Sequence, residues 1–253
     1  MSRISVVIPT FNRQQYLNET IKSLSNQTVK PFEVIIVDNG TEISSVNEIN
    51  LNINFFRTVP NIGVSQARNF GLSVAKGDYV AFLDDDDLYE SNVIETVCQE
   101  IELFNPDIIL LKMKSYETNF EVQSKSMDLK SNNLLKKTIL KKNPGIVGSS
   151  TIINRNLLLD SNFSPYDPFL LTGEDKAFVL DLLLNNNEIK IVRSGSYFLY
   201  RNHASSNRQS TIKKLTQGKR SFYKKYKRHM TFIEKFYNHI NLLRLLIMSK
   251  LKK

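Results

Sequence analysis

The chain has 253 residues, of which 41% are hydrophobic and 23% charged, a composition typical of a globular protein that excludes collagenous, low-complexity and disordered classes. A single cysteine, Cys98, excludes an internal disulfide framework and a cysteine-rich zinc module. The net charge is +9, but residues 208–253 carry fourteen Lys and Arg against one acidic residue, whereas residues 1–207 carry 20 basic and 24 acidic residues.

The first 111 residues alternate short apolar runs with amphipathic segments. The apolar runs predict strands over residues 4–8, 33–37, 54–59, 79–83 and 108–111, and apolar residues at helical spacing predict helices over residues 17–24, 64–75 and 93–104. This alternation predicts an α/β fold with a mostly parallel open sheet and helices on both of its faces.

The second half of the chain has a looser pattern. Polar residues 117–133 indicate long loops, followed by a strand near 147–154, a helix over 174–184 and a pair of strands within 189–200. The basic segment is predicted to form one or two helices. We therefore divide the chain into a main domain, residues 1–207, with halves at 1–112 and 113–207, and a basic amphipathic helical tail, residues 208–253.

Polar side chains follow several of the predicted strands at the point where each strand ends. Residues 10–13 follow the first strand, Asp38 ends the second, and four aspartates, residues 84–87, end the fourth. Asn61 and Gly63 lead into the helix that carries Arg68. Because ligands bind outside the carboxyl ends of parallel strands, we expect one crevice to collect these residues.

The four consecutive aspartates have two readings. Adjacent carboxylates repel one another, so a cleft that holds them favours a hard divalent cation, and Mg²⁺ takes one or two carboxylates together with substrate phosphates. The alternative is a solvated acidic turn in which Asp87 caps the next helix. The position at the end of a buried strand favours the cation.

Four other polar residues leave alternatives open. Asp38 is either a turn residue or a carboxylate that binds a nucleotide base or ribose. A dehydrogenase would need a glycine-rich first turn, which PTFNR at residues 9–13 lacks. Glu174 and Asp175 are either favourable acids at a helix N-terminus or a general base, and His203 is either a loop histidine or a metal or phosphate ligand.

Four blocks resemble glycosyltransferase family 2: SVVIPTFNR (residues 5–13), EVIIVD (33–38), NIGVSQARNFG (61–71) and GDYVAFLDDDD (77–87). GED at residues 173–175 and YRNH at residues 200–203 extend the match. The resemblance implies a GT-A fold and an inverting, metal-dependent transfer of a sugar from a nucleotide sugar to an acceptor hydroxyl. The expected donors are UDP-sugars, and the expected context is cell-surface polysaccharide assembly.

The resemblance also implies roles for individual residues. Asp38 would read an N–H of uracil, and Arg68 would lie by the base or the phosphates. Asp175, with Glu174 beside it, would be the catalytic base. Asp86 would bind Mn²⁺ or Mg²⁺, with Asp84 sharing the metal or the ribose and His203 as a third ligand. The remaining donor-binding residues would be Pro9, Thr10, Phe11, Asn12, Arg13, Asn61, Gly63 and Asp85.

Apolar residues in the tail recur at spacings of four and three, from Phe232 through Phe236 and Leu243 to Ile247. Basic residues flank them, which is typical of helices that lie on anionic membranes. We therefore expect a cytoplasmic enzyme held at the inner face of the membrane beside a glycan or lipid-linked acceptor. The alternative is that the stripe packs on the body or on a second copy in a homodimer.

Two other classes of function remain as alternatives. Aromatic residues Phe222, Tyr223 and Tyr226 lie among lysines, a pattern that also suits nucleic-acid binding through the tail. The mildly acidic body argues against nucleic acid as the main partner. A catalytically silent subunit that binds nucleotide sugars is the third reading.

Overall fold

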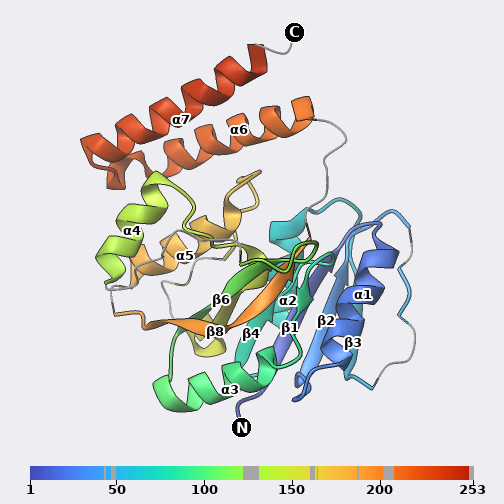
Figure 1. Cartoon of the computed structure of the whole chain (residues 1–253). Helices are drawn as coiled ribbons and strands as arrows, with labels where there is room; N and C mark the ends of the chain where they lie inside the picture. The colour runs from blue at the N-terminus through green and yellow to red at the C-terminus, as the bar shows by residue number, and fades with distance from the viewer. Residues whose placement is uncertain are drawn as a thin grey trace.

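A computed structural model of the chain describes residues 1–42, 44–46, 50–121, 131–159, 163, 165–186, 188–201 and 208–250. Its centre is one eight-stranded sheet in the order β3-β2-β1-β4-β7-β6-β8-β5 (Figure 1). The strands are β1 (Ile4–Thr10), β2 (Glu33–Asp38), β3 (Ile53–Arg57), β4 (Tyr79–Phe82), β5 (Leu88–Tyr89), β6 (Ile108–Ser115), β7 (Thr151–Asn154) and β8 (Ile191–Tyr200).

The N-terminal half of the sheet is parallel throughout. β1 pairs with β2 and β4, and β2 pairs with β3, all in parallel. The register places Thr10 beside Asp38, so the ends of β1 and β2 meet at one edge. β7 is antiparallel to both β4 and β6, and β8 runs parallel to β6 and antiparallel to β5. The sheet is therefore mixed, with its parallel part where the sequence predicts it.

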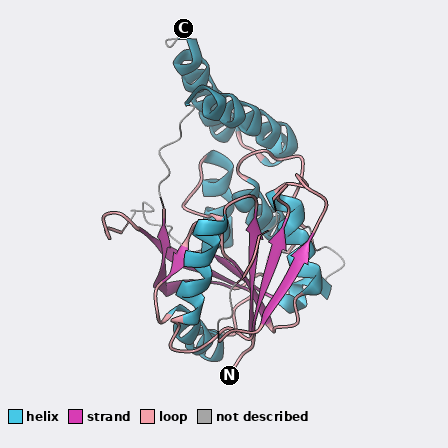
Figure 2. Cartoon of the chain, turned by 90° about the vertical axis from the view of Figure 1, so that its right-hand side faces the viewer, coloured by secondary structure: helices cyan, strands magenta, loops and turns pink. Residues whose placement is uncertain are grey.

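Helices cover both faces of the sheet (Figure 2). The helices α1 (Gln14–Ser25) and α3 (Val93–Phe104) pack on one face, and α2 (Val64–Val74), α4 (Asn132–Lys141) and α5 (Glu174–Asn185) pack on the other. Strand residues such as Val6 and Val7 alternate between the two cores. This alternation is the period-two pattern of a strand buried on both faces, which explains the unbroken apolar runs.

The C-terminal hairpin consists of α6 (Arg208–Tyr226) and α7 (Phe232–Lys250), two antiparallel helices stacked beyond α4 and α5 (Figure 1). α6 buries Phe222 and Tyr226 in the core that also contains α5. These two aromatic rings are therefore not free to stack on bases, whereas Tyr223 is only partly buried. No helix within the described part of the chain is long and apolar enough to span a membrane.

Three expectations differ from the structure. Residues 189–200 hold the single long strand β8 rather than a strand pair, because β8 stays paired with β6 on both sides of an irregularity between Arg193 and Tyr197. Asp87 does not cap α3; Asn92 precedes that helix, and the Asp87 side chain is buried. α4 begins at the end of the stretch 117–133 expected to be loop and covers residues for which no element was predicted, because only Leu135, Ile139 and Leu140 mark its apolar face. Cys98 is buried as expected.

Candidate active site

A cavity of about 480 Å³ opens at the carboxyl ends of β1 and β4. Its walls come from the loop after β1, the N-terminus of α2, the aspartate run after β4 and the N-terminus of α5. The lining residues are Pro9, Thr10, Phe11, Arg13, Asn39, Asn61, Gly63, Val64, Arg68, Asp84, Asp85, Asp86, Glu174 and Asp175. The structure thus brings most of the sequence-predicted residues to one place.

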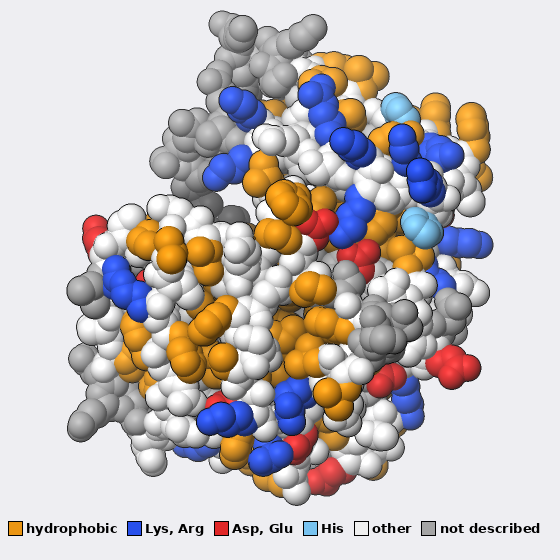
Figure 3. Space-filling model, turned by 180° about the vertical axis from the view of Figure 1, so that it is seen from behind, with side chains coloured by type: hydrophobic (Ala, Val, Ile, Leu, Met, Phe, Trp, Pro, Cys, Tyr) orange, Lys and Arg blue, Asp and Glu red, His pale blue; other side chains and the backbone are white. Residues whose placement is uncertain are grey.

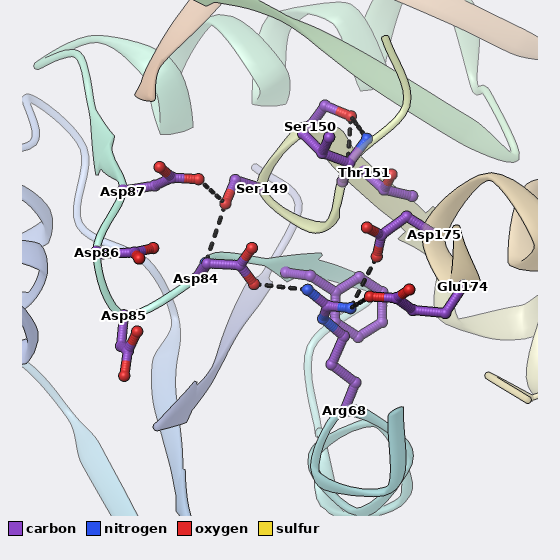
Figure 4. Close-up of polar contacts among 12 residues, drawn as sticks. Arg68, Asp84, Asp85, Asp86, Asp87, Ser149, Ser150, Thr151, Glu174 and Asp175 are labelled. Carbon is purple, nitrogen blue, oxygen red and sulfur yellow. Dashed lines mark hydrogen bonds and ion pairs between the residues drawn. The ribbon is translucent and has the colours of Figure 1, made fainter. Parts of the chain in front are cut away.

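Arg68 lies between the two groups of carboxylates (Figure 4). Its Nη2 is 2.6 Å from Asp84 Oδ1 and its Nη1 is 2.7 Å from Asp175 Oδ1, with Glu174 Oε1 at 3.8 Å from Nη1. The Arg68 side chain is only 2% exposed. The family resemblance implies that Arg68 lies by the base or the phosphates. In the structure Arg68 lines the cavity, and its two Nη atoms join the aspartate run to α5.

Two residues frame the Arg68 guanidinium. Its Cζ lies 5.2 Å from the centre of the Tyr166 ring, which in turn stacks on Phe178 at 4.2 Å. On another side, a Cβ on Gly148 would lie 2.3 Å from Arg68 Nη2, so only glycine leaves room there. Packing therefore holds the guanidinium in place, and the two carboxylates that it contacts gain a fixed spacing.

The aspartates after β4 point in different directions (Figure 4). Asp85 turns toward the loop after β1, where its Oδ2 accepts a 2.8 Å hydrogen bond from Thr10 Oγ1 and its Oδ1 lies 3.3 Å from Arg13 Nη1. The same Arg13 nitrogen pairs with Asp86. Asp85 therefore connects the two strand ends, and Asp84, Asp85 and Asp86 all line the cavity.

Asp87 belongs to the support of the site rather than to its wall. Ser149 Oγ donates to Asp87 Oδ2 at 2.6 Å and accepts from the Asp84 backbone N–H at 3.0 Å. The backbone N–H of Arg201 also donates to Asp87. Ser149 thus fixes the start and the end of the aspartate run to each other.

Burial perturbs several of these carboxyl groups. It raises the pKa of Asp175 to about 7, against the lowering effect of Arg68, and the nearby Glu174 and Asp84 charges raise it further. Burial likewise raises the pKa of Asp85 to about 6 and that of Asp87 to about 8. Burial would lower the pKa of Arg68, but the charges of Asp175 and Asp84 hold it well above its usual value.

The donor set fits a hard divalent cation that also takes ligands from a substrate. Asp84 and Asp86 offer carboxylate oxygens to the cavity, and Mg²⁺ typically takes one or two carboxylates plus phosphate oxygens. Two arginines, Arg13 and Arg68, face five carboxylates, those of residues 84–86, 174 and 175, so the site is short of positive charge. Among the described residues, no group of three or more His, Cys, Asp or Glu side chains is close enough to form a complete protein-only metal site.

Other predicted residues lie elsewhere. Neither Asp38 nor Asn12 is among the described residues that line the cavity. Asp38 is buried and accepts from the Gly40 and Ser44 backbone N–H groups at 2.9 and 3.2 Å. Asn12 accepts from the Thr41 N–H, so both side chains shape the loop after β2. His203 lies outside the described residues.

Sequence reasoning did not single out Gly148, Ser149 and Tyr166. The small residues GSS at 148–150 interrupt an apolar stretch, and such an interruption could have signalled a close approach of backbone to a side chain. Tyr166 gave no comparable signal, because its contacts with Arg68 and Asn69 are made across almost a hundred residues of sequence.

Residues 5–160 match the family model described as glycosyl transferase family 2. The chain belongs to glycosyltransferase family 2. The resemblance seen in the sequence is thereby confirmed, as is the expectation of a glycosyltransferase enzyme.

Among curated proteins, the chain is similar to the poly(ribitol-phosphate) beta-N-acetylglucosaminyltransferases TarP and TarS of Staphylococcus aureus. Identity to TarP is 28% over 229 residues, which covers 85% of this chain and 68% of TarP. Identity to TarS is 28% over 207 residues, covering 78% of this chain but only 35% of TarS. The chain therefore corresponds to a part of these longer proteins.

Solved structures show the same fold. A fragment of Staphylococcus aureus TarS in complex with UDP-GlcNAc matches with a TM-score of 0.63 at 22% identity, over 96% of this chain and 71% of that one. The mannosyltransferase PcManGT from Pyrobaculum calidifontis, in complex with GDP-Man and Mn²⁺, matches with a TM-score of 0.62 at 15% identity, over 95% and 69% of the two chains. The predicted GT-A-like α/β fold is confirmed.

Proposed function

We propose that this glycosyltransferase moves a sugar from a UDP-sugar to a hydroxyl of a glycan or lipid-linked glycan, with inversion at the anomeric carbon. The observation that carries the proposal is that one cavity is lined both by Asp84 and Asp86 and, across Arg68, by Glu174 and Asp175. An inverting transfer needs a leaving-group site and a base on opposite sides of one sugar.

The donor's diphosphate belongs at the end of the cavity formed by the aspartate run. Asp86 and Asp84 would hold Mn²⁺ or Mg²⁺ there, and the bound ion would stabilise the negative charge of the departing diphosphate. Gly63, with φ +84°, starts α2 at the wall of the cavity, so its helix N-terminus offers further N–H groups to an anion. The complex of TarS with UDP-GlcNAc supports a uridine donor, and the PcManGT complex supports a divalent ion.

Asp175 is proposed to act as the general base. Its carboxylate takes the proton of the acceptor hydroxyl while that oxygen bonds to the anomeric carbon and the bond to the UDP oxygen breaks. One displacement inverts the configuration, and UDP leaves with the electron pair of the broken bond. Arg68 fixes the orientation of Asp175 relative to the donor end of the cavity.

The surroundings of the enzyme form the second part of the proposal. We assign residues 1–207 to the catalytic domain and the C-terminal hairpin to attachment at the inner face of an anionic membrane, where a lipid-linked acceptor would lie. Residues 208–253 carry fourteen basic residues and one acidic residue, and this positive charge supports the placement at an anionic membrane. Hexosyl or N-acetylhexosaminyl transfer to a surface polysaccharide is consistent with the name of TarP.

Calorimetric titration with UDP, TDP, GDP and CDP, each with and without Mn²⁺, tests the donor assignment. We expect Mn²⁺-dependent binding of UDP, with GDP and CDP at least about tenfold weaker because their bases present a different hydrogen-bonding edge, and with TDP weaker because it adds a methyl group and lacks the ribose 2′-hydroxyl. Tighter binding of another nucleotide would replace uridine in the proposal. Failure of all four to bind would contradict the assignment of this cavity to a nucleotide sugar.

A further inference from the structure

One face of α7 packs on the protein, and the opposite face carries uncovered apolar side chains. On the packed face, Asn238 Nδ2 donates to the Leu140 carbonyl of α4 at 2.8 Å. The exposed apolar stripe consists of Phe232, Phe236, Leu243 and Ile247, which are 82%, 56%, 57% and 47% exposed. Their spacing of four, seven and four places them in one row along the helix. An exposed apolar row of this length indicates a binding surface.

A small cavity lies beside this stripe, between α6 and α7. It has a volume of about 180 Å³ and is called the hairpin cavity here; it is lined by Lys219, Arg220, Tyr223, Asn238, His239 and Leu242. The rings of Tyr223 and His239 meet edge to face at 4.9 Å across the two helices. His239 lies three residues after Phe236 and four before Leu243, so one side of the cavity adjoins the apolar stripe.

No acidic side chain is among the described residues that line the hairpin cavity. In the described part of the hairpin the only acidic side chain is Glu234, which is buried and accepts from the Thr231 N–H at 2.7 Å. Burial and the charge of Arg244 both lower the pKa of Lys219. Cations placed together in this way attract an anion.

Two acids of the body also reach the hairpin. Asp167 and Asp181 pair with Lys225 Nζ at 2.8 and 2.9 Å, and Tyr226 Oη donates to Asp181 at 2.8 Å. These carboxylates are therefore engaged by residues outside the hairpin cavity. The positive charge of Lys219 and Arg220 is left available to a ligand.

We propose that the hairpin cavity binds the phosphate of an anionic membrane phospholipid while the apolar stripe lies at the level of its acyl chains. The inference rests on the proposed membrane attachment and deepens it, because it names the groups that recognise the lipid. Lys219 and Arg220 would pair with the phosphate, and Phe236 and Leu243 would lie in the interface.

Charge favours this occupant over a second copy of the chain. A dimer through the stripe would bring two sets of basic side chains together, whereas an anionic bilayer supplies both the negative charge and the apolar layer. Figure 3 shows Lys and Arg side chains next to hydrophobic side chains over the hairpin, with histidines among them. This mixture suits a lipid surface.

The test compares two charge-matched double variants of the full chain in co-sedimentation with vesicles of equal parts phosphatidylglycerol and phosphatidylcholine. Lys219→Ala with Arg220→Ala removes the cavity cations, and Lys214→Ala with Lys224→Ala removes two exposed cations that do not line it. We expect the cavity variant to bind at least about tenfold more weakly than the control variant. Equal losses in the two variants would overturn the site.

Soluble ligands separate a lipid headgroup from free phosphate. Calorimetry with monomeric dihexanoylphosphatidylglycerol should give binding that the cavity variant loses, and inorganic phosphate should bind at least about tenfold more weakly, because it has no acyl chain for the stripe. Equal affinity for inorganic phosphate would overturn the lipid assignment. So would a wild-type dimer in solution that Phe236→Ser with Leu243→Ser dissociates.

Titration of each protein with UDP and Mn²⁺ keeps the two proposals distinguishable. Unchanged UDP binding by the cavity variant shows that its fold and catalytic cavity are intact, so its lipid defect then supports the site. Wild-type chain that binds UDP but not the anionic vesicles would contradict the membrane attachment and the lipid site, and would leave the glycosyltransferase assignment standing.

Discussion

Individual carboxylates in the cavity have separate tasks, which their contacts distinguish. Ser149 holds Asp87 outside the cavity wall, whereas Asp85 lines the cavity while it contacts Thr10 and Arg13, and Arg13 also pairs with Asp86. Asp84 and Asp86 face the cavity, and Asp175 reaches it from α5. All four residues of the run 84–87 are aspartates, so the sequence could not show which of them line the cavity. That depends on the direction of each side chain.

Replacing Asp86 should remove metal-dependent donor binding. In Asp86→Ala we expect the Kd for UDP in Mn²⁺ to rise at least about tenfold, since a carboxylate ligand is lost, while Mn²⁺-free binding stays the same. Asp78→Ala is the control, because Asp78 pairs with Arg3 away from the cavity. Unchanged affinity in Asp86→Ala would remove this residue from the metal site. Titration calorimetry makes both measurements.

The pH dependence of turnover should report Asp175. Its raised pKa of about 7 means that the carboxylate form, which is the base, decreases about tenfold for each pH unit below that value. With saturating donor and Mn²⁺, kcat should therefore rise with pH and level off above about pH 7. A kcat that falls as the pH rises from about 5 to about 7 would contradict a carboxylate base at this position.

Arg68 should also be a major contributor to stability. Arg68→Met leaves the largely buried Asp175 and the partly exposed Asp84 without their cation, and removing one partner of a buried ion pair typically costs about 3–5 kcal/mol of unfolding free energy. Arg3→Met breaks an exposed pair with Asp78 and should cost less than about 1 kcal/mol. Urea unfolding measures both. Equal losses of unfolding free energy in the two variants would mean that the Arg68 ion pairs do not stabilise the fold more than an exposed pair does.

At the scale of elements, α6 rests directly on the segment that carries the base. A Cβ on Gly218 would lie 1.8 Å from Thr172 Oγ1, and Thr172 is three residues before Asp175. Lys176, next to Asp175, lies with its Nζ 3.6 Å from the centre of the Phe222 ring. The hairpin therefore contacts the segment that carries Asp175, the proposed base.

Gly218→Ala should disturb transfer more than donor binding. The added methyl group must push Thr172 and the following turn, and overpacking of this kind costs about 1–3 kcal/mol. We expect kcat to fall at least about tenfold while the Kd for UDP changes less than about twofold, because the aspartate run is untouched. Adding Thr172→Ala, which removes the nearest atom, should restore part of the rate. An unchanged kcat would show that α6 does not position the base.

The buried strands and the amphipathic helices of the N-terminal half are the elements that the sequence predicts best, for a physical reason. β1, β2 and β4 are buried on both faces and so appear as continuous apolar runs, and α2 and α3 keep an apolar row. β5 has only two residues, Leu88 and Tyr89, and exists through its pairing with β8. α4 is short and polar, and its three buried residues are identified as core residues only once the contact of α4 with α5 is known.

At the scale of the whole molecule, the fold brings distant segments to one cavity and leaves a basic hairpin at the C-terminal end. The aspartates at the end of β4 were predicted because strand ends of a parallel sheet share an edge, whereas the role of Glu174 and Asp175 came from the family resemblance. The sequence could not predict Tyr166 or Gly148, whose roles arise only when α2 meets the segments around them. The position of the apolar stripe on the outer face of α7 likewise follows from packing.

The central claim is that Asp175 is the base of an enzyme whose donor binds at the opposite end of the same cavity. Asp175→Asn tests it most directly, with UDP-sugar binding by calorimetry and transfer to acceptor measured on the same protein. We predict that the Kd for the donor stays within about threefold and that kcat falls at least about a hundredfold, since the amide keeps the shape but cannot accept the proton. Full transfer activity in Asp175→Asn would contradict the account.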